Sequence, residues 1–159
     1  MSSNVTLEIG MSALSKSLIR VANHGDFEAI KTMGMEFIKS TEHISKYAEE
    51  EYIDLLIMDM LNASQFTDII LIGDGGMLMG KAIPFLFGSA TMATEIAWYV
   101  SPDKRWTGLG KELIEAFEYW AKNVSNCAFI SMGSVNDAVG EYYIKKGYEL
   151  SERAYIKEL

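Results

Sequence analysis

The sequence predicts a mixed α/β (α+β) domain, in which helices cover both faces of one central sheet. Three observations favour it. The chain has 159 residues, enough for one domain with a substantial core. Segments with helical spacing of apolar residues alternate with short β-branched runs. No repeat, low-complexity tract or linker divides the chain, so residues 1–159 are predicted to form a single domain.

The first third of the chain is expected to supply one strand and two helices. Ser17–Ala22 has the length and β-branched content of a strand. Asp26 is the expected N-cap of a helix that runs to about Ser40. A second helix, about Ala48–Asn62, begins with the acidic residues 49–51. Acidic residues complement the dipole of a helix at its first turn, and they would also suit a cationic acceptor; the sequence leaves both readings open.

The middle of the chain predicts three strands. Asp68–Ile72 reads as a strand, residues 73–76 as a hairpin turn and Met77–Phe87 as the returning strand. Thr94–Val100 is the next strand, stopped by Ser101 and Pro102. Residues 75–82 are one position short of a phosphate-binding P-loop, because Ala82 stands where Ser or Thr is required. Pro84 also prevents the helix that such a loop must open, so we expect no nucleotide hydrolysis there.

The last third is expected to hold two helices and three strands. An amphipathic helix starts near Gly108, a strand spans Ala128–Met132, and a short helix spans Asp137–Lys146. Tyr148–Glu152 and Ala154–Glu158 are predicted to be closing strands, which brings the sheet to about seven strands.

Composition narrows the class of function. The net charge of −8 argues against a nucleic-acid partner, which would need a basic surface. No segment has the roughly 20 apolar residues of a membrane helix, and no secretory signal is evident, so we expect a cytoplasmic protein without a membrane partner. Cys127 is the only cysteine and lies in an apolar run, so we expect a small buried side chain rather than a nucleophile. His24 and His43 have no second ligand nearby, so no metal site is predicted.

The segment from Arg105 to Lys111 carries the strongest functional signal. Gly108 and Gly110 allow a tight turn that leaves backbone N–H groups uncovered at the start of a helix. The helix dipole adds partial positive charge, so a strand, a glycine loop and a helix together suit a phosphate or diphosphate. A simple helix-entry turn also explains the motif on its own.

Two motifs in order make the chain resemble the GCN5-related N-acetyltransferase (GNAT) superfamily. The first runs from Val100 through Pro102 and Arg105 to Gly108 and Gly110. The second is the run 136–148, with Asn136, Tyr143, Lys145, Gly147 and Tyr148 at the family's spacing. The resemblance covers essentially the whole chain. Residues 95–100 look most like the branch that acetylates ribosomal-protein N-termini, polyamines and related amines.

The resemblance implies a mostly antiparallel sheet whose fourth and fifth strands splay apart around acetyl-coenzyme A (acetyl-CoA). Unpaired backbone groups of Trp98, Tyr99 and Val100 would bind the pantetheine arm. Asn136 would cap its helix, bind the cofactor arm, or do both. The diphosphate would lie on backbone N–H groups of the glycine loop, namely those of Arg105, Trp106, Thr107, Gly108, Leu109, Gly110 and Lys111. Arg105 and Lys111 would add positive charge or simply be solvated.

The resemblance also implies direct transfer of acetyl to a primary amine in a ternary complex. Tyr143 holds the position whose hydroxyl faces the sulfur, although a core tyrosine is the alternative. A backbone N–H near Tyr99 or Val100 would stabilise the oxyanion. Glu95 is the candidate general base, directly or through water, but it lies one residue from the family position, so a β-bulge near Trp98 must redirect it. Otherwise Glu95 is structural, or solvent takes the proton.

Two further expectations concern the protein as a whole. Members of the superfamily often pair, so a homodimer is among the expected states. A non-catalytic acyl-CoA-binding module with the same fold is the alternative function. The acceptor would be set by the loop around Thr41–Tyr47 and by the Phe87–Met92 connection, neither of which carries a recognisable code.

Overall fold

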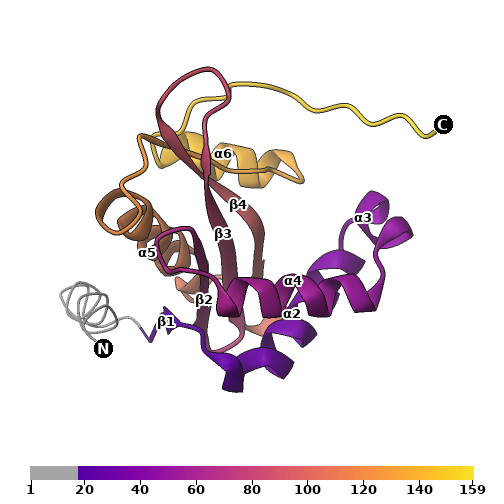
Figure 1. Cartoon of the computed structure of the whole chain (residues 1–159). Coiled ribbons are helices and arrows are strands. Elements are labelled where there is room, and N and C mark those ends of the chain that lie inside the picture. The colour runs from indigo at the N-terminus through magenta and orange to yellow at the C-terminus, as the bar shows by residue number, and fades with distance from the viewer. Residues whose placement is uncertain (1–17) are drawn as a thin grey trace, which may run out of the picture.

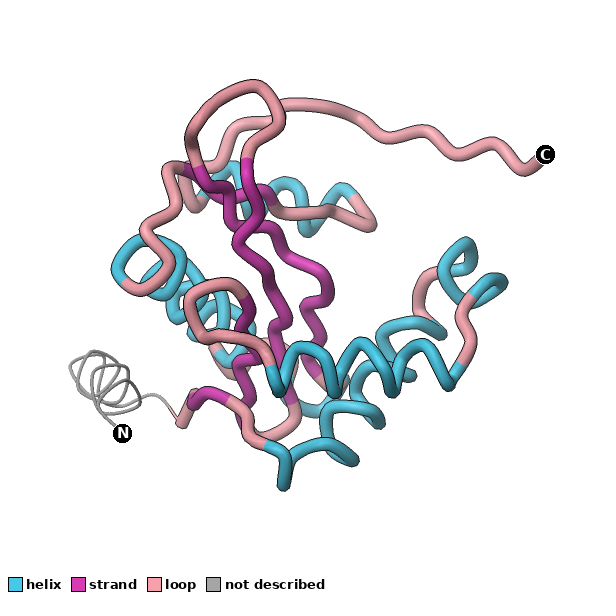
Figure 2. Tube along the Cα trace, in the orientation of Figure 1, coloured by secondary structure: helices cyan, strands magenta, loops and turns pink. Residues whose placement is uncertain are grey.

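The computed structural model describes residues 18–159 (Figure 1). The elements in chain order are β1 (Arg20–Val21), the 3-10 turn η1 (His24–Asp26), α2 (Phe27–Lys39), α3 (Glu42–Tyr47), α4 (Glu50–Asn62), β2 (Asp68–Gly73), β3 (Gly76–Pro84), β4 (Thr91–Val100), the 3-10 turn η2 (Pro102–Lys104), α5 (Leu109–Asn123), β5 (Phe129–Ser131) and α6 (Asp137–Lys145). Figure 2 shows the strands as one sheet between the helices.

The sheet is mixed and mostly antiparallel, as predicted. Its order is β1-β2-β3-β4-β5; the first four strands pair antiparallel and β5 joins β4 in parallel. The first strand was predicted to span Ser17–Ala22, but the observed β1 spans only Arg20–Val21. Ser17 lies outside the described residues. The near-P-loop residues form a turn and β3, and no helix follows them directly.

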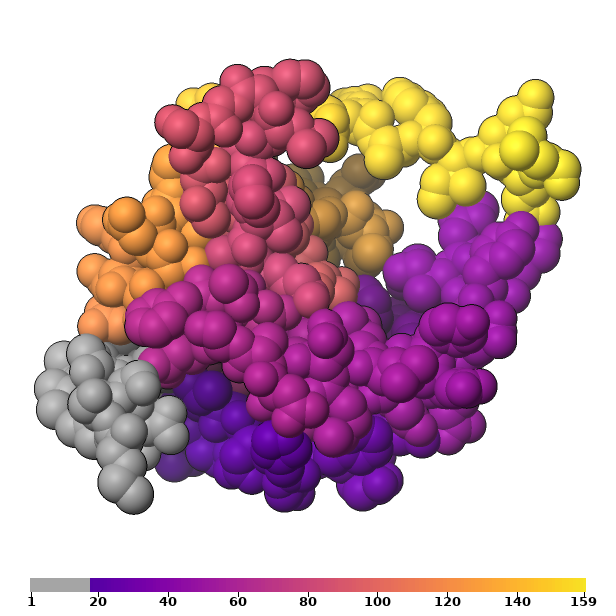
Figure 3. Space-filling view, in the orientation of Figure 1, coloured from indigo at the N-terminus to yellow at the C-terminus, as the bar shows by residue number. Residues whose placement is uncertain are grey.

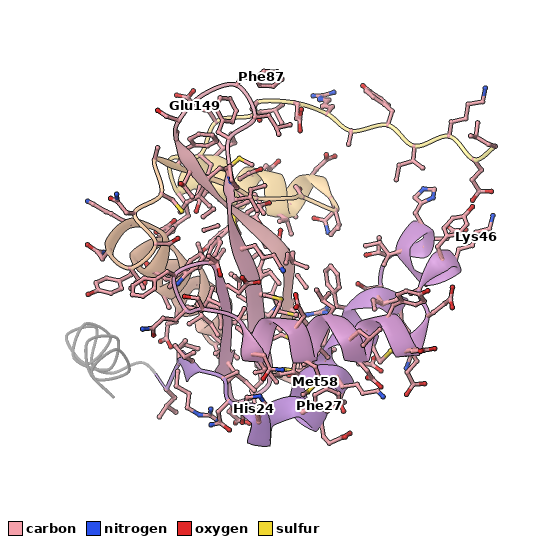
Figure 4. The ribbon with its side chains drawn as sticks, viewed as in Figure 1. His24, Phe27, Lys46, Met58, Phe87 and Glu149 are labelled. Carbon is pink, nitrogen blue, oxygen red and sulfur yellow. The ribbon has the colours of Figure 1, made fainter. Side chains whose placement is uncertain are left out.

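The prediction of about seven strands is wrong for the described chain, which has five. Neither Tyr148–Glu152 nor Ala154–Glu158 forms a strand. A strand needs a neighbour for its backbone groups, and residues 149–159 instead extend away from β5 and are exposed to solvent. The tail runs past α6 toward α3, where Lys46 forms an ion pair with Glu158 (Figures 1 and 4). In the space-filling view the tail bridges a hollow between these two parts of the molecule (Figure 3).

Both faces of the sheet are buried, because successive side chains of β2 point to opposite faces. Ile69 and Leu71 pack with α5, whereas Ile70 and Ile72 pack with α2 and α4. Large side chains complete each side; those fully buried on α5 are Leu113, Ile114, Phe117 and Trp120, and those on α2 and α4 are Ile30 and Ile57. The two-faced architecture thus follows from near-continuous apolar runs in the central strands.

Gly80 lets α5 approach the middle of the sheet. A Cβ atom at Gly80 would lie 2.3 Å from Cε2 and 2.7 Å from Cζ of Phe117. Since Phe117 is fully buried, we expect Gly80→Ala to lower the free energy of unfolding by about 1–3 kcal/mol through overpacking.

Urea denaturation monitored by circular dichroism measures this effect. Gly34→Ala in α2 is the matched control, because its Cβ would make only an ordinary 3.9 Å contact with Met77. Helix propensity predicts that this control gains up to about 1 kcal/mol. Equal stability of the two variants would contradict the packing assigned to Gly80.

Candidate active site

The site is built around the point where β4 and β5 separate. The two strands share three pairs, the last joining Thr94 to Ser131. β5 ends there, while β4 continues to Val100. Beyond Thr94, β4 therefore has no strand neighbour on its β5 side, which is the splayed arrangement that the resemblance implies.

A β-bulge redirects the side chains of β4. Gly80 of β3 pairs with Glu95, but Met79 pairs with Ala97, so Ile96 is an extra residue in β4. Trp98 consequently packs on the α5 face, the face that Ala93 also occupies. Because side chains alternate, Glu95 is on that face as well. The bulge expected near Trp98 thus lies two residues before it.

Glu95 lies at the fork between the two strands. Its Oε2 accepts a hydrogen bond of 3.1 Å from the backbone N–H of Gly133, just beyond β5. Burial raises the pKa of Glu95, and the Gly133 N–H opposes that rise only in part. The carboxyl group is therefore a stronger base than an ordinary glutamate, and it also links the two diverging segments.

Tyr143 of α6 faces the same region. Only 5% of its surface is exposed, and its hydroxyl has no hydrogen-bond partner among the described residues. Burial raises the pKa of Tyr143, and the nearby charge of Glu95 raises it further. Tyr143 is thus a neutral phenol with a free donor, close enough to Glu95 to interact with it electrostatically.

Two neighbouring donors share this condition. The sequence pointed only to the backbone of Trp98, and it indicated no role for Tyr142. The ring of Trp98 lies 6.0 Å from that of Tyr143 and 6.1 Å from that of Tyr142. Within residues 18–159, the indole N–H of Trp98 and the buried hydroxyl of Tyr142 also lack partners. Adjacent helix positions normally diverge, but here Trp98 contacts both tyrosines. Buried donors without acceptors are rare in proteins, so these three fit a ligand that carries oxygen or sulfur acceptors.

The loop before α5 has backbone donors that point to no acceptor. In the described part of the chain, the N–H groups of Trp106, Gly108, Gly110 and Lys111 have no hydrogen-bond partner. The N–H of Leu109 differs, because it bonds the Thr107 hydroxyl at 3.4 Å. Since this loop begins a 15-residue helix, it fits an anion, and a diphosphate matches the number of free donors.

The two glycines of the motif serve different purposes. Gly108 has a left-handed backbone (φ 95°), and a Cβ there would meet nothing within 4 Å. Gly110 is instead a packing glycine, because its Cβ would lie 3.0 Å from the Trp98 ring and 3.4 Å from Val100. The backbone N–H of Gly110 stays in the loop, but its lack of a side chain is required by β4.

The remaining predicted residues have identifiable contacts. Arg105 folds back on β4, where its Nε donates to the Val100 carbonyl at 3.2 Å. Lys111 lies 3.7 Å from Glu115 on the exposed side of α5. Asn136 caps α6, because its Oδ1 accepts from the Val139 N–H at 3.0 Å. Tyr99 packs on the opposite face of the sheet, beside α2 and α4, so only its backbone is available to the fork.

Within residues 18–159, metal ligation and membrane insertion find no support. No group of three His, Cys, Asp or Glu residues within 18–159 could hold a metal. None of the helices in that range is long and apolar enough to cross a membrane. Cys127 is half-buried beside the α5 core, with its Sγ 3.6 Å from the Ser125 hydroxyl.

Gly108 provides a direct test of the anion site. We expect Gly108→Asp to weaken CoA binding about 10- to 100-fold, since a carboxylate close to a diphosphate costs a few kcal/mol. Gly108→Asn is the matched control, because Asn and Asp tolerate a left-handed backbone about equally and only Asp is charged. Calorimetric titration with CoA measures both. Equal affinities of the Asp and Asn variants would show that no diphosphate lies at this loop.

Comparisons with known proteins identify the family and the fold of the chain. The model of the acetyltransferase (GNAT) family matches residues 37–148. No curated protein sequence matches the chain. Among solved structures, a transcriptional regulator from Bacillus halodurans C-125 has a TM-score of 0.70 at 17% identity, covering 89% of this chain and 98% of that one.

Two further structures share the fold. AAC(6')-Iy, solved in complex with the bisubstrate analogue CoA-S-monomethyl-acetylneamine, has a TM-score of 0.69 at 18% identity, covering 89% of this chain and 96% of that one. An acetyltransferase from Trypanosoma brucei has a TM-score of 0.67 at 18% identity, with 89% and 98% coverage. At such identities these structures establish the fold, while the family model covers most of the chain. The protein therefore belongs to the GNAT family of acetyltransferases.

Proposed function

We propose that the protein transfers the acetyl group of acetyl-CoA to a primary amine, directly and within a ternary complex. The observation that carries this proposal is the buried, unpartnered hydroxyl of Tyr143 beside Glu95, at the fork of β4 and β5. A module that only bound acyl-CoA would have no need of a buried base and a free phenol in one place. Bound acetyl-CoA supplies the activated thioester carbonyl; the protein supplies everything else.

Glu95 acts on the amine. Its raised pKa suits it to remove a proton from the ammonium, directly or through one water, because the base then holds the proton in a partly apolar site. The free nitrogen attacks the carbonyl carbon and forms the new C–N bond. A backbone N–H on the open edge of Trp98–Val100 would stabilise the oxyanion.

Tyr143 acts on the sulfur as the C–S bond breaks. An ordinary phenol has a pKa of about 10 and an alkyl thiol one of about 8.5, so full proton transfer to the thiolate costs about 2 kcal/mol. Burial raises the pKa of Tyr143 and increases that cost. Tyr143 therefore stabilises the leaving thiolate as a hydrogen-bond donor. Glu95 takes the first proton from the ammonium, and the second proton, which the nitrogen loses as the tetrahedral intermediate collapses, passes to solvent.

The acceptor side of the fork favours a cationic amine. The chain carries a net charge of −8, and the relative AAC(6')-Iy is an aminoglycoside N-acetyltransferase. The acidic start of α4 contributes less than the sequence indicates, because Glu50 and Asp54 already form ion pairs with Lys31 at 2.7 and 2.8 Å. The hollow between α6 and α3, which the C-terminal tail bridges, is the region left for the acceptor body (Figure 3).

Release of free thiol from acetyl-CoA tests the proposal. The panel should contain a polyamine, an aminoglycoside, a lysine peptide and a peptide with a free N-terminus. We expect amine-dependent thiol release with at least one class, and mass spectrometry should find the acetylated amine. CoA binding without turnover on any amine would instead favour the non-catalytic acyl-CoA-binding module.

A further inference from the structure

Trp106 is an exposed aromatic residue in the loop that precedes α5. Its relative exposure is 102%, whereas Trp120 is 1% exposed and Trp98 packs in the fork. A tryptophan usually buries 150–250 Å² and stabilises a fold by doing so. Trp106 contributes no such burial, so the fold itself does not account for the indole at this position.

The backbone of Trp106 makes this position more unusual. Its φ is 70°, in the left-handed region, and among the described non-glycine residues only Asn126 shares a positive φ. Asn tolerates that conformation, but a bulky aromatic residue adopts it at a cost in strain. Hydrogen bonds on both sides fix the loop: the Arg105 N–H bonds the Ser101 carbonyl at 3.2 Å, and the Thr107 hydroxyl bonds the Lys104 carbonyl at 2.6 Å. The loop thus holds the indole in solvent.

Trp106 lies next to the backbone N–H groups that have no partner, so the ligand that binds those groups can also contact its indole. Its own N–H is one of the unpartnered groups, and Gly108 is two residues away. In CoA, the diphosphate joins the pantetheine arm to the adenosine. If the arm runs into the fork toward Tyr143, the adenosine must leave on the solvent side of the loop, which is where the indole lies.

We propose that the indole of Trp106 stacks on the adenine ring of CoA and so makes the protein select the complete coenzyme over its pantetheine portion. This inference rests on the proposed function, because it requires the diphosphate to lie on the same loop. Purine rings stack on exposed tryptophan with a free energy that corresponds to about a 10- to 100-fold gain in affinity. Stacking on adenine would bury the Trp106 ring, which the fold leaves exposed.

Ligand pairs separate the stack from the other contacts. CoA and dephospho-CoA both carry adenine, whereas 4′-phosphopantetheine lacks the adenosine. In Trp106→Asn, a residue that suits the left-handed backbone replaces the ring. We expect this variant to bind CoA and dephospho-CoA about 10- to 100-fold more weakly than the wild type, and 4′-phosphopantetheine unchanged. Trp106→Phe should retain most of the affinity for CoA.

Two controls complete the experiment. Phe87→Ala removes another exposed aromatic ring, 88% exposed on the connection between β3 and β4, and should bind CoA like the wild type (Figure 4). CoA should also quench tryptophan fluorescence more strongly in the wild type than in the Phe variant, which keeps only the contribution of Trp98 in the fork. Unchanged CoA affinity in Trp106→Asn would overturn the stack and leave the acetyltransferase proposal intact. Failure of the wild type to bind CoA at all would overturn the proposed function together with the stack.

Discussion

Tyr143→Phe is expected to lower kcat about 10²-fold while the Kd for CoA stays within a factor of about three. The phenol acts only as negative charge develops on sulfur, so its loss removes an interaction of the transition state rather than of the ground state. Thiol release measures kcat, and calorimetry measures the Kd.

This substitution should change the chemistry of the site without weakening the fold. Because the Tyr143 hydroxyl has no partner among residues 18–159, its removal breaks no hydrogen bond of the fold. We therefore expect the Tm of Tyr143→Phe to be equal to or above that of the wild type. Tyr142→Phe is the matched control, since that hydroxyl is also buried without a partner, but the charges that act on its pKa are those of Lys146, Glu115 and Glu118 rather than that of Glu95. Equal kcat values for the two variants would remove Tyr143 from the mechanism.

Glu95→Gln is expected to lower kcat/KM by about 10²-fold or more and to remove one limb of the pH profile. Burial raises the pKa of Glu95, so in the wild type the basic carboxylate forms at a higher pH than in an ordinary glutamate. Wild-type activity should therefore rise with pH through that raised pKa. The Gln variant, which cannot titrate, should lack this rise.

The amide keeps the structural role of Glu95. Its oxygen can still accept from the Gly133 N–H, so the fork should remain closed at that point. Because the pKa of Glu95 is raised in the folded state, this carboxyl group lowers the free energy of unfolding of the wild type as the pH rises through that pKa. The Gln variant carries no such charge at pH 8, so its Tm at that pH should not fall below that of the wild type. Glu149→Gln, in the exposed tail, serves as the control (Figure 4). A Gln variant with wild-type kcat/KM and an unchanged profile would leave Glu95 as a purely structural residue.

The sequence predicted those parts of the site that depend on local patterns. The turn at Gly108 and the N-cap at Asn136 could each be predicted from a few neighbouring residues, because turn formation and helix capping are short-range effects. The order of the central strands followed from apolar runs and turns in the same way.

Features that depend on contacts between residues far apart in the sequence could not be predicted from the sequence. The bulge at Ile96 arises where Gly80 of another strand faces Glu95, so its position is set by pairing between strands. The closing strands failed for a related reason: the Tyr and Ile residues of Ala154–Glu158 express a local preference for extended backbone, but a strand also requires an edge to pair with. The meeting of Tyr142 with Trp98 likewise depends on how α6 docks against β4.

A crystal structure with CoA bound tests the central claim most directly. The account predicts the diphosphate within hydrogen-bond distance of the backbone N–H groups of Gly108 and Gly110, and the thiol sulfur beside the hydroxyl of Tyr143. A diphosphate bound elsewhere, or a sulfur remote from Tyr143 and Glu95, would contradict it.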